Sequence, residues 1–239
     1  MENNLQKLKA ESLKELFIKE MEAKIISGIF KPGDRLPAER DIASQMGISR
    51  SIVNAGLMDL ASKGFVDIRP RKGTVVLDFE VEGTPQMLSS IMNYNKGKLN
   101  MKLLNDMIDT RMLIEIESAK LAAINRTQED LNTMESLLED IEKSDLSDIN
   151  EFVDFNYTFH HRITIASGNI VFAMIFKSFE PVCKNLIKMY FETKDFRRNS
   201  LSRHERLYQA ILEKKVEESA LKMKEILLTG KKELERLNI

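Results

Sequence analysis

Cysteine and long apolar runs are scarce in this chain, and each scarcity excludes a class of protein. The 239 residues include one cysteine, Cys183, so neither an internal disulfide nor a multi-cysteine zinc site can form. Cys183 stands in the apolar segment FEPVCKNLI, which favours a small core residue over a reactive thiol. No stretch approaches the ~20 apolar residues of a membrane-spanning helix, so we expect no membrane partner.

The amino terminus also lacks a targeting signal. Residues 1–16, MENNLQKLKAESLKEL, are charged and amphipathic, and they have no apolar centre of the secretory kind. With 43% hydrophobic and 31% charged residues, the composition is that of a soluble globular protein. We therefore expect a cytoplasmic protein.

Charge is unevenly distributed, although the net charge is only −1. Residues 31–72 hold eight Lys and Arg against five Asp and Glu, an excess of +3, so the other 197 residues carry −4. A mildly basic segment attached to an acidic remainder suits a module that binds a polyanion.

The first third of the chain has the pattern of short helices followed by a pair of strands. Apolar residues recur at helical spacing before residue 27 and again on both sides of Gly47. Gly47 supplies a helix stop, Ser49 can cap the next helix, and Gly64 ends that helix. The segments FVDIRP and TVVLDF flank the tight turn RKG and read as strands. The expected elements are a first helix that Gly28 and residues 30–33 end, helices 38–46 and 49–63, and strands 65–70 and 74–79.

From residue 86 onward the pattern is helical only, and it predicts an all-α bundle of six helices. Residues 79–99, with Gly83, Pro85 and Gly97, have the composition of a connection. The chain therefore divides into residues 1–78, a linker of residues 79–99 and a helical domain of residues 100–239. The expected bundle helices are Met101–Ile124, Gln128–Lys143, Asp148–Ala166, Ile170–Phe191, Asp195–Glu213 and Lys215–Leu237.

A helix-turn-helix is one use of two short helices broken by a glycine. Its second helix enters the DNA major groove with its N-terminal end, where backbone N–H groups, hydroxyls and arginines hydrogen-bond phosphates and bases. Ser49, Arg50 and Ser51 supply such groups at a helix start. On these three residues alone, an ordinary capped surface helix is the alternative.

A longer pattern favours DNA binding. Residues 32–76 contain PGDRLPAER, GISRSIV, the helix end LASKG and the turn RKGT, and with these motifs they resemble the DNA-binding domain of the GntR family of bacterial transcription regulators. The resemblance implies a mainly α winged helix that binds a double-stranded DNA operator, with Arg50 on its recognition helix and residues 71–73 at the wing tip. The DNA-binding residues it implies are Arg35, Arg40, Ser49, Arg50, Ser51, Asn54, Arg69, Arg71, Lys72, Gly73 and Thr74.

Two positions depart from that family's pattern. Asn54 stands where an arginine that reads guanine is usual, and an amide suits the N6/N7 edge of adenine. A contact with phosphate or solvent only is the alternative. Gly56 lies inside the recognition helix at a cost of up to ~1 kcal/mol relative to alanine. It indicates either close approach to another backbone or drift at a tolerant site.

The helical part resembles the all-helical effector domain, or FCD domain, of the FadR-type branch of the same family. The resemblance is carried by IDTRMLIEIESAKLAA, DFNYTFHHRITIASGN and RHERLYQAILEKKVEESALKMKEIL, and it covers nearly all of residues 100–235. It implies a pocket for a small effector. In many members this is a carboxylate beside a divalent metal, and in others it is an acyl-thioester without a metal.

The candidate effector-binding residues are Arg111, Asn156, His160 and His204. Asn156 and His160 are four residues apart and share a helix face, and His204 can add a second imidazole from another helix. The family's third histidine falls on Ile226, which cannot ligate. We therefore expect a divalent metal of the zinc, nickel or manganese class to be held weakly by Asn156, His160 and His204, or not at all.

Arg111 allows two interpretations. It precedes Glu115 by one helical turn and could form an i,i+4 pair worth a few tenths of a kcal/mol. If Arg111 points inward, an unpaired guanidinium would be costly, and a carboxylate of the effector would supply its bidentate partner.

The sequence thus predicts a ligand-responsive transcription factor, and we expect a repressor. Dimerisation is expected because paired reading heads bind a two-fold DNA site. The competing interpretations are a metal-dependent enzyme that uses His160 and His204, and a metal sensor without an organic ligand. No nucleophile–base arrangement supports an enzyme, and the missing third histidine argues against a metal sensor.

Overall fold

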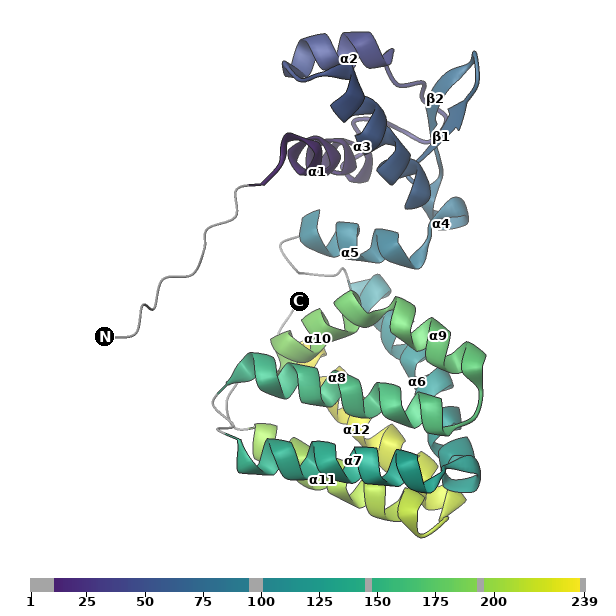
Figure 1. The fold of residues 1–239 in the computed structure, drawn as a ribbon, viewed down its shortest axis with the longest axis vertical. Helices are drawn as coiled ribbons and strands as arrows, with labels where there is room; N and C mark the ends of the chain where they lie inside the picture. Colours follow the sequence, from purple (N-terminus) through teal and green to yellow (C-terminus); the bar gives the residue numbers. More distant parts are fainter. Residues whose placement is uncertain (1–10, 95–100, 145–147, 193–195, 237–239) are drawn as a thin grey trace, which may run out of the picture. The chain divides into compact units, whose positions relative to one another are not determined.

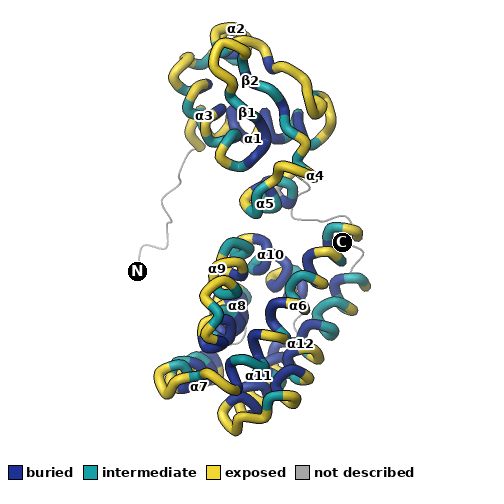
Figure 2. The backbone as a smooth tube through the Cα atoms, turned by 90° about the vertical axis from the view of Figure 1, so that its right-hand side faces the viewer, coloured by how far each residue is buried: buried dark blue, intermediate teal, exposed yellow. Residues whose placement is uncertain are grey.

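The computed structural model describes residues 11–94, 101–144, 148–192 and 196–236. The chain forms two compact units, residues 1–96 and residues 97–239, and each is described by itself (Figures 1 and 2). The predicted fold class, a winged helix followed by an all-α domain, is confirmed. Among the residues described, no helix combines the length and the apolar content of a membrane span.

The first unit packs three helices against a two-stranded antiparallel sheet. Strand β1 pairs with strand β2 so that Val66 lies opposite Val76 and Arg69 lies opposite Gly73. The core between helices and sheet is made by large side chains such as Phe17, Leu60 and Phe65. The elements are α1 Leu13–Ile26, α2 Glu39–Met46, α3 Arg50–Ser62, β1 Val66–Arg69 and β2 Gly73–Val76.

Three turn signals in the sequence set the boundaries of α2 and α3, as predicted. Gly47 ends α2 in the left-handed conformation, with φ 66°, which glycine adopts without steric cost. The Ser49 hydroxyl accepts a hydrogen bond from the Ile52 N–H at 3.3 Å and caps α3. Gly64 follows α3 with φ 87°, and a Cβ there would lie 2.7 Å from a backbone oxygen, that of Glu82.

Gly56 is explained by close packing inside the first unit. A Cβ at this position would lie 2.3 Å from the ring of Phe17 on α1. The missing side chain therefore lets α3 approach α1 across an aromatic ring. The close neighbour is a side chain, which was neither of the two expected explanations, another backbone or drift at a tolerant site.

The segment expected to be a linker contains two helices, α4 Phe79–Glu82 and α5 Pro85–Tyr94. Helix α5 packs against α1, and a buried polar contact holds the two together: Ser90 Oγ donates to Glu22 Oε1 at 2.8 Å. The Lys63 ammonium reaches the same carboxylate at 2.7 Å. Residues 79–94 are therefore part of the first unit in this structure.

The second unit is an all-α bundle in which α6 runs along α12 and α8 contacts α6, α7, α9 and α10. In Figure 2 the buried residues of these helices, drawn in dark blue, lie on the sides that face the neighbouring helices. The prediction of one helix over 170–191 is wrong: the helix is interrupted at Phe179, and α10 begins there with Pro181 in its first turn. Proline has no N–H with which to continue the hydrogen bonds of α9, whereas it is tolerated in the first turn of a new helix. The described elements are α6 Met101–Asn125, α7 Gln128–Lys143, α8 Ile149–Ala166, α9 Ile170–Ser178, α10 Glu180–Phe191, α11 Phe196–Leu212 and α12 Val216–Arg236.

Candidate functional site: a DNA-reading face and an enclosed cationic cavity

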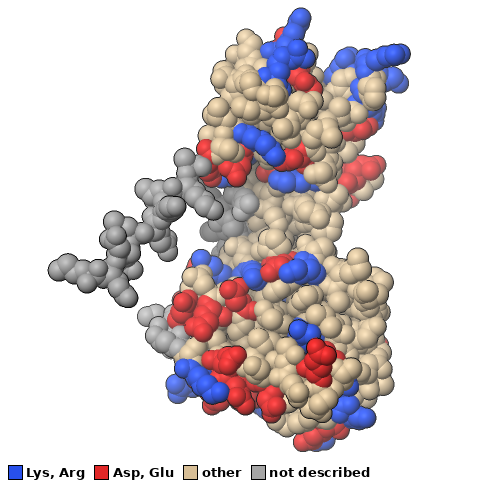
Figure 3. Space-filling model, viewed as in Figure 1, with Lys and Arg blue, Asp and Glu red and all other residues tan. Residues whose placement is uncertain are grey.

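The start of α3, the start of α2 and the wing border one shallow groove on the first unit. Figure 3 shows Lys and Arg side chains protruding at this end of the unit, over α2 and over the β1–β2 turn. The basic residues that line the groove come from three separate segments of sequence. They are Arg35, Arg40, Arg50, Arg69 and Arg71.

The predicted DNA-binding residues differ in how free their side chains are. Arg50, Arg71 and Lys72 are exposed. Arg40 contacts Asp41 at 3.0 Å and Arg69 contacts Asp67 at 2.7 Å, and such exposed pairs are weak enough for phosphates to replace their carboxylates. The exposed Ser49 and Ser51 hydroxyls lie 2.9 Å apart at the start of α3.

Gly73 and Thr74 act through the wing backbone. A Cβ on Gly73 would lie 2.7 Å from Arg35 Nε, so this glycine leaves room for the guanidinium of Arg35 beside the wing. Thr74 is only 8% exposed, and its carbonyl accepts a hydrogen bond from the Leu36 N–H at 2.9 Å. The Thr74 side chain therefore belongs to the interior of the sheet.

Asn54 has a partner within the protein. Its Nδ2 donates to Glu39 Oε1 at 3.0 Å and so connects α3 to the first turn of α2. A contact between Asn54 and adenine stays a prediction, and it would require the amide to leave or share this carboxylate.

The wing tip is strained at Arg71. The Lys72 N–H donates to Arg69 O at 3.0 Å and closes a four-residue turn with Pro70 second and Arg71 third. Arg71 has φ 62°, and turns with positive φ at the third position normally carry glycine or asparagine there. A non-glycine residue in this region costs roughly 1–2 kcal/mol. Such strain tends to persist at functional positions, and here it presents a guanidinium at the tip.

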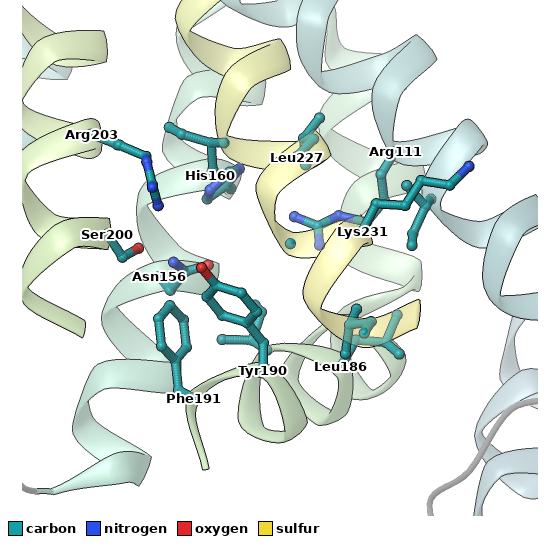
Figure 4. Close-up of a pocket in the computed structure, with 15 residues that line it drawn as sticks. Arg111, Asn156, His160, Leu186, Tyr190, Phe191, Ser200, Arg203, Leu227 and Lys231 are labelled. Carbon is teal, nitrogen blue, oxygen red and sulfur yellow. The ribbon is translucent and has the colours of Figure 1, made fainter. Parts of the chain in front are cut away.

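The second unit contains a cavity between α6, α8, α10, α11 and α12 (Figure 4). About 60 Å³ of it is open to the centres of water-sized molecules, which is room for roughly four to six waters. The polar residues that line the cavity come from all five helices. They are Arg111, Asn156, His160, Tyr190, Ser200, Arg203 and Lys231.

A buried carboxylate organises one wall of this cavity. Glu115 is completely buried. Its Oε1 accepts a hydrogen bond from Arg111 Nε at 2.5 Å, and its Oε2 accepts one from His160 Nδ1. Arg111 therefore combines both interpretations: it pairs with Glu115 along the helix, and it also borders the cavity.

Hydrogen bonds fix the orientation of both histidine rings. His204 Nδ1 lies 2.7 Å from the Ser200 carbonyl, which can only accept, so this nitrogen carries the proton and His204 Nε2 has a free lone pair. His160 donates to Glu115 through Nδ1 in the same way. The two Nε2 atoms then face each other at 3.1 Å, with Asn156 Nδ2 3.2 Å from that of His204. A shared proton or a metal ion between them would resolve the repulsion of two lone pairs.

Burial and neighbouring charges set the protonation of this cluster. Burial would raise the pKa of Glu115, but Arg111 and His160 together outweigh it and lower the pKa to about 2. Burial, with a contribution from His160, lowers the pKa of His204 to about 3. At neutral pH, Glu115 is therefore a carboxylate and His204 a neutral imidazole. Burial raises the pKa of Cys183 to about 11, as suits the core residue that we expected.

Sequence patterns located only part of this cavity. Of the residues predicted to bind an effector, Arg111, Asn156 and His160 line it, whereas His204 is fully buried behind His160. The patterns missed four polar lining residues because no motif marks them and only helix packing brings them together. These are Tyr190, Ser200, Arg203 and Lys231.

A winged helix with a basic groove, followed by a helical unit with a cavity lined by cationic side chains, is typical of a DNA-binding transcription regulator. Family models agree with both parts: the model of the bacterial regulatory proteins of the gntR family matches residues 14–76, and the FCD domain model matches residues 106–229. The chain belongs to the GntR family, in its FadR-type branch. The family consists of regulators, so the alternative of an enzyme is not supported.

Relatives with named roles are also transcription regulators. The HTH-type transcriptional regulator LutR of Bacillus subtilis is 29% identical over 78% of this chain and 85% of its own length. The Glc operon transcriptional activator of Escherichia coli is 28% identical over 84% of this chain and 80% of its own length. The match to regulator Rv0494 of Mycobacterium tuberculosis is 29% identical but spans only 56% of this chain and 53% of that protein.

Solved structures support the fold. The structure of Lar, which controls expression of the Listeria monocytogenes agr system, has a TM-score of 0.66 and covers 96% of this chain and 100% of its own. That of Escherichia coli McbR/YncC has a TM-score of 0.54 with the same coverage. Both are 19% identical to this chain.

Replacing Arg71 by glycine should separate wing stability from DNA affinity. The change relieves a strained backbone, so thermal stability should stay the same or rise by up to ~1 kcal/mol. Loss of a phosphate-binding charge should weaken binding to all DNA sequences. It should also reduce the slope of log affinity against log salt concentration by about one. Fluorescence anisotropy of labelled DNA over a series of salt concentrations measures the DNA affinity and its salt dependence.

Lys214→Gly is the matched control, because Lys214 has φ 59° between α11 and α12. It should relieve similar strain and leave DNA affinity unchanged. Equal DNA affinity of Arg71→Gly and wild type would remove Arg71 from the DNA-binding face.

Proposed function

We propose that this regulator is a homodimeric repressor whose operator affinity is controlled by a small carboxylate in the cavity of the helical unit. One observation carries the effector class. Three cationic side chains line the cavity, those of Arg111, Arg203 and Lys231, and its lining contains no Asp or Glu. A cavity with this charge favours an anionic ligand.

The three cations differ in how far they are already neutralised. Arg111 pairs with Glu115, and Lys231 lies 3.5 Å from Asp109. Arg203 hydrogen-bonds the phenol of Tyr190, and within the described part of the chain no carboxylate pairs with it. Arg203 is therefore the side chain that gains most from the carboxylate of an effector, through two parallel charge-assisted hydrogen bonds.

The size of the cavity favours a small acid over an acyl-thioester. Its open space of about 60 Å³ suits a ligand of a few heavy atoms, and the lining closes around it from five helices. Figure 4 shows Arg203 on one side of the cavity, with Arg111 and Lys231 on the other. An acyl-thioester would require these helices to separate.

The donor set fits a weakly held divalent metal. A cation between nitrogens 3.1 Å apart can reach both at the ~2.1 Å of metal–imidazole bonds. His160, His204 and the amide of Asn156 would hold it, and the acceptors on each Nδ1 are the partners that metal-binding histidines usually have. Ile226 lines the same cavity and contributes no ligand. The metal would supply a further positive centre for the effector carboxylate.

Binding in the cavity would act on the DNA-reading unit by linkage. Suppose that an effector binds one arrangement of the paired DNA-binding domains more tightly than the other. Operator affinity must then change by the same factor. Repression requires only that the dimer occupies its operator, whereas activation would need a further contact with the transcription machinery. The winged helix and the cavity are sufficient for repression.

A panel of roughly two- to four-carbon acids, with an acyl-CoA as the alternative, tests the effector class. A true effector should raise the melting temperature and shift operator affinity in the same concentration range. Arg203→Gln should weaken that acid by ~10-fold or more, since a hydrogen bond to a charged group contributes about 1.5–3 kcal/mol.

Arg206→Gln is the control, because Arg206 is exposed on the same helix and bonds Ser202 O. Effector affinity unchanged in Arg203→Gln, or stabilisation by the acyl-CoA alone, would contradict a small carboxylate at this site.

Ile226→His tests the metal. An added imidazole ligand should tighten divalent-metal affinity by ~10-fold or more, measured by calorimetric titration after treatment with a chelator. Tight stoichiometric metal in wild type would show that a further residue completes the site. Absence of binding in both proteins would mean that Asn156, His160 and His204 do not act together on a metal.

A further inference from the structure

The groove on the first unit contains one carboxylate among its basic residues. Of the described residues that line the groove, Glu39 alone is acidic, whereas five are arginines. A carboxylate on this surface repels the phosphates of DNA and lowers the affinity for every sequence. Its position is therefore unfavourable for binding the DNA backbone and requires a different explanation.

The Glu39 carboxylate is held by an amide instead of an arginine. Its Oε1 accepts a hydrogen bond from Asn54 Nδ2 at 3.0 Å, and this is its one polar contact among the residues that the structure describes. Asn54 is exposed and lies four residues after Arg50 on α3, so the two side chains share the face of the helix that enters the major groove. Glu39 thus contacts a residue that is placed to reach the bases.

This hydrogen bond decides the orientation of the Asn54 amide. A carboxylate can only accept, so the group that faces Glu39 is the NH2 group, and Oδ1 remains available. The amide then offers DNA one acceptor, Oδ1, and one donor, the second N–H of Nδ2. In the major groove this pair matches the N6 donor and the N7 acceptor of adenine, whereas guanine presents two acceptors, N7 and O6.

We propose that Glu39 is a positioning residue for base recognition, which directs Asn54 to adenine and against guanine in the operator. An unrestrained amide could rotate by 180° and offer its NH2 group to guanine. With Glu39 in place, the same rotation would lose a charge-assisted hydrogen bond and bring Oδ1 against the carboxylate. Glu39 therefore gives Asn54 a selectivity that the amide lacks alone. This proposal concerns the operator sequence, and it does not depend on the effector, the metal or the sign of regulation.

A purely structural role for Glu39 is the competing explanation. Glu39 lies in the first turn of α2, which has no side-chain cap, and a carboxylate there interacts favourably with the helix dipole. Its bond to Asn54 also connects α2 to α3. A structural role predicts changes in stability and in affinity for all DNA sequences together. The proposed role changes the ratio of the affinities for two bases at one position.

Selection of binding sites by the full chain from a randomised double-stranded DNA library tests the proposal. Asn54→Arg identifies the operator position that residue 54 reads, because an arginine there should change the selected base to guanine. Wild type should select adenine at that position and bind it ~10-fold or more tightly than guanine. Glu39→Gln should lower this ratio by ~5-fold or more, because a glutamine amide donates as well as accepts and satisfies Asn54 in either orientation. Fluorescence anisotropy with oligonucleotides that differ at this base pair measures the ratio.

Asp41→Asn is the matched control, because Asp41 lies in the same first turn and its carboxylate accepts from Arg40. It should change the affinity for all sequences together and leave the adenine-to-guanine ratio at the wild-type value. An unchanged ratio in Glu39→Gln, or a wild-type preference for a base other than adenine, would overturn the proposal. If Asn54→Arg changes the selected base at no position, residue 54 reads no base and the proposal fails, while DNA binding by the groove stands. If wild type enriches no sequence, the proposal fails together with sequence reading by the groove.

Discussion

The cavity of the helical unit depends on one buried carboxylate, that of Glu115. A carboxylate without exposure to water is stable only with partners, and Glu115 has two, the guanidinium of Arg111 and the imidazole of His160. Loss of the Arg111 guanidinium would leave a buried carboxylate without its ion-pair partner, at a cost of about 3–5 kcal/mol. Through His160, the same carboxylate sets the orientation of a ring that contacts His204 on another helix. One ionised group thus joins α6, α8 and α11 around the cavity.

The parts of this protein that its sequence could predict are those determined over short distances along the chain. Gly47 and Ser49 act on backbone groups within a few residues, so the helix-turn-helix could be placed from sequence. Asn156 and His160 share a helix face because of their spacing alone. In each case a local rule of backbone geometry decides the structure, and the tertiary fold agrees with it.

The parts that the sequence could not predict depend on packing between distant segments. Arg203 and Tyr190 meet only because α10 and α11 border the same cavity. The docking of α5 on α1 depends on a contact between Ser90 and Glu22, which are 68 residues apart. Apolar periodicity also failed to divide α9 from α10, because it continues through Phe179, where the backbone leaves helical geometry just before Pro181.

Fixed histidine tautomers point the Nε2 atoms of His160 and His204 at one place beside the cationic cavity. Long-range ¹H–¹⁵N NMR of metal-free protein labelled with ¹⁵N-histidine measures this directly, because the ¹⁵N shifts of each ring report its protonation. His204 should be neutral with its proton on Nδ1, and it should stay so down to about pH 4, because its pKa is about 3. A proton on His204 Nε2 with Nδ1 free, or a charged His204 at neutral pH, would contradict the account.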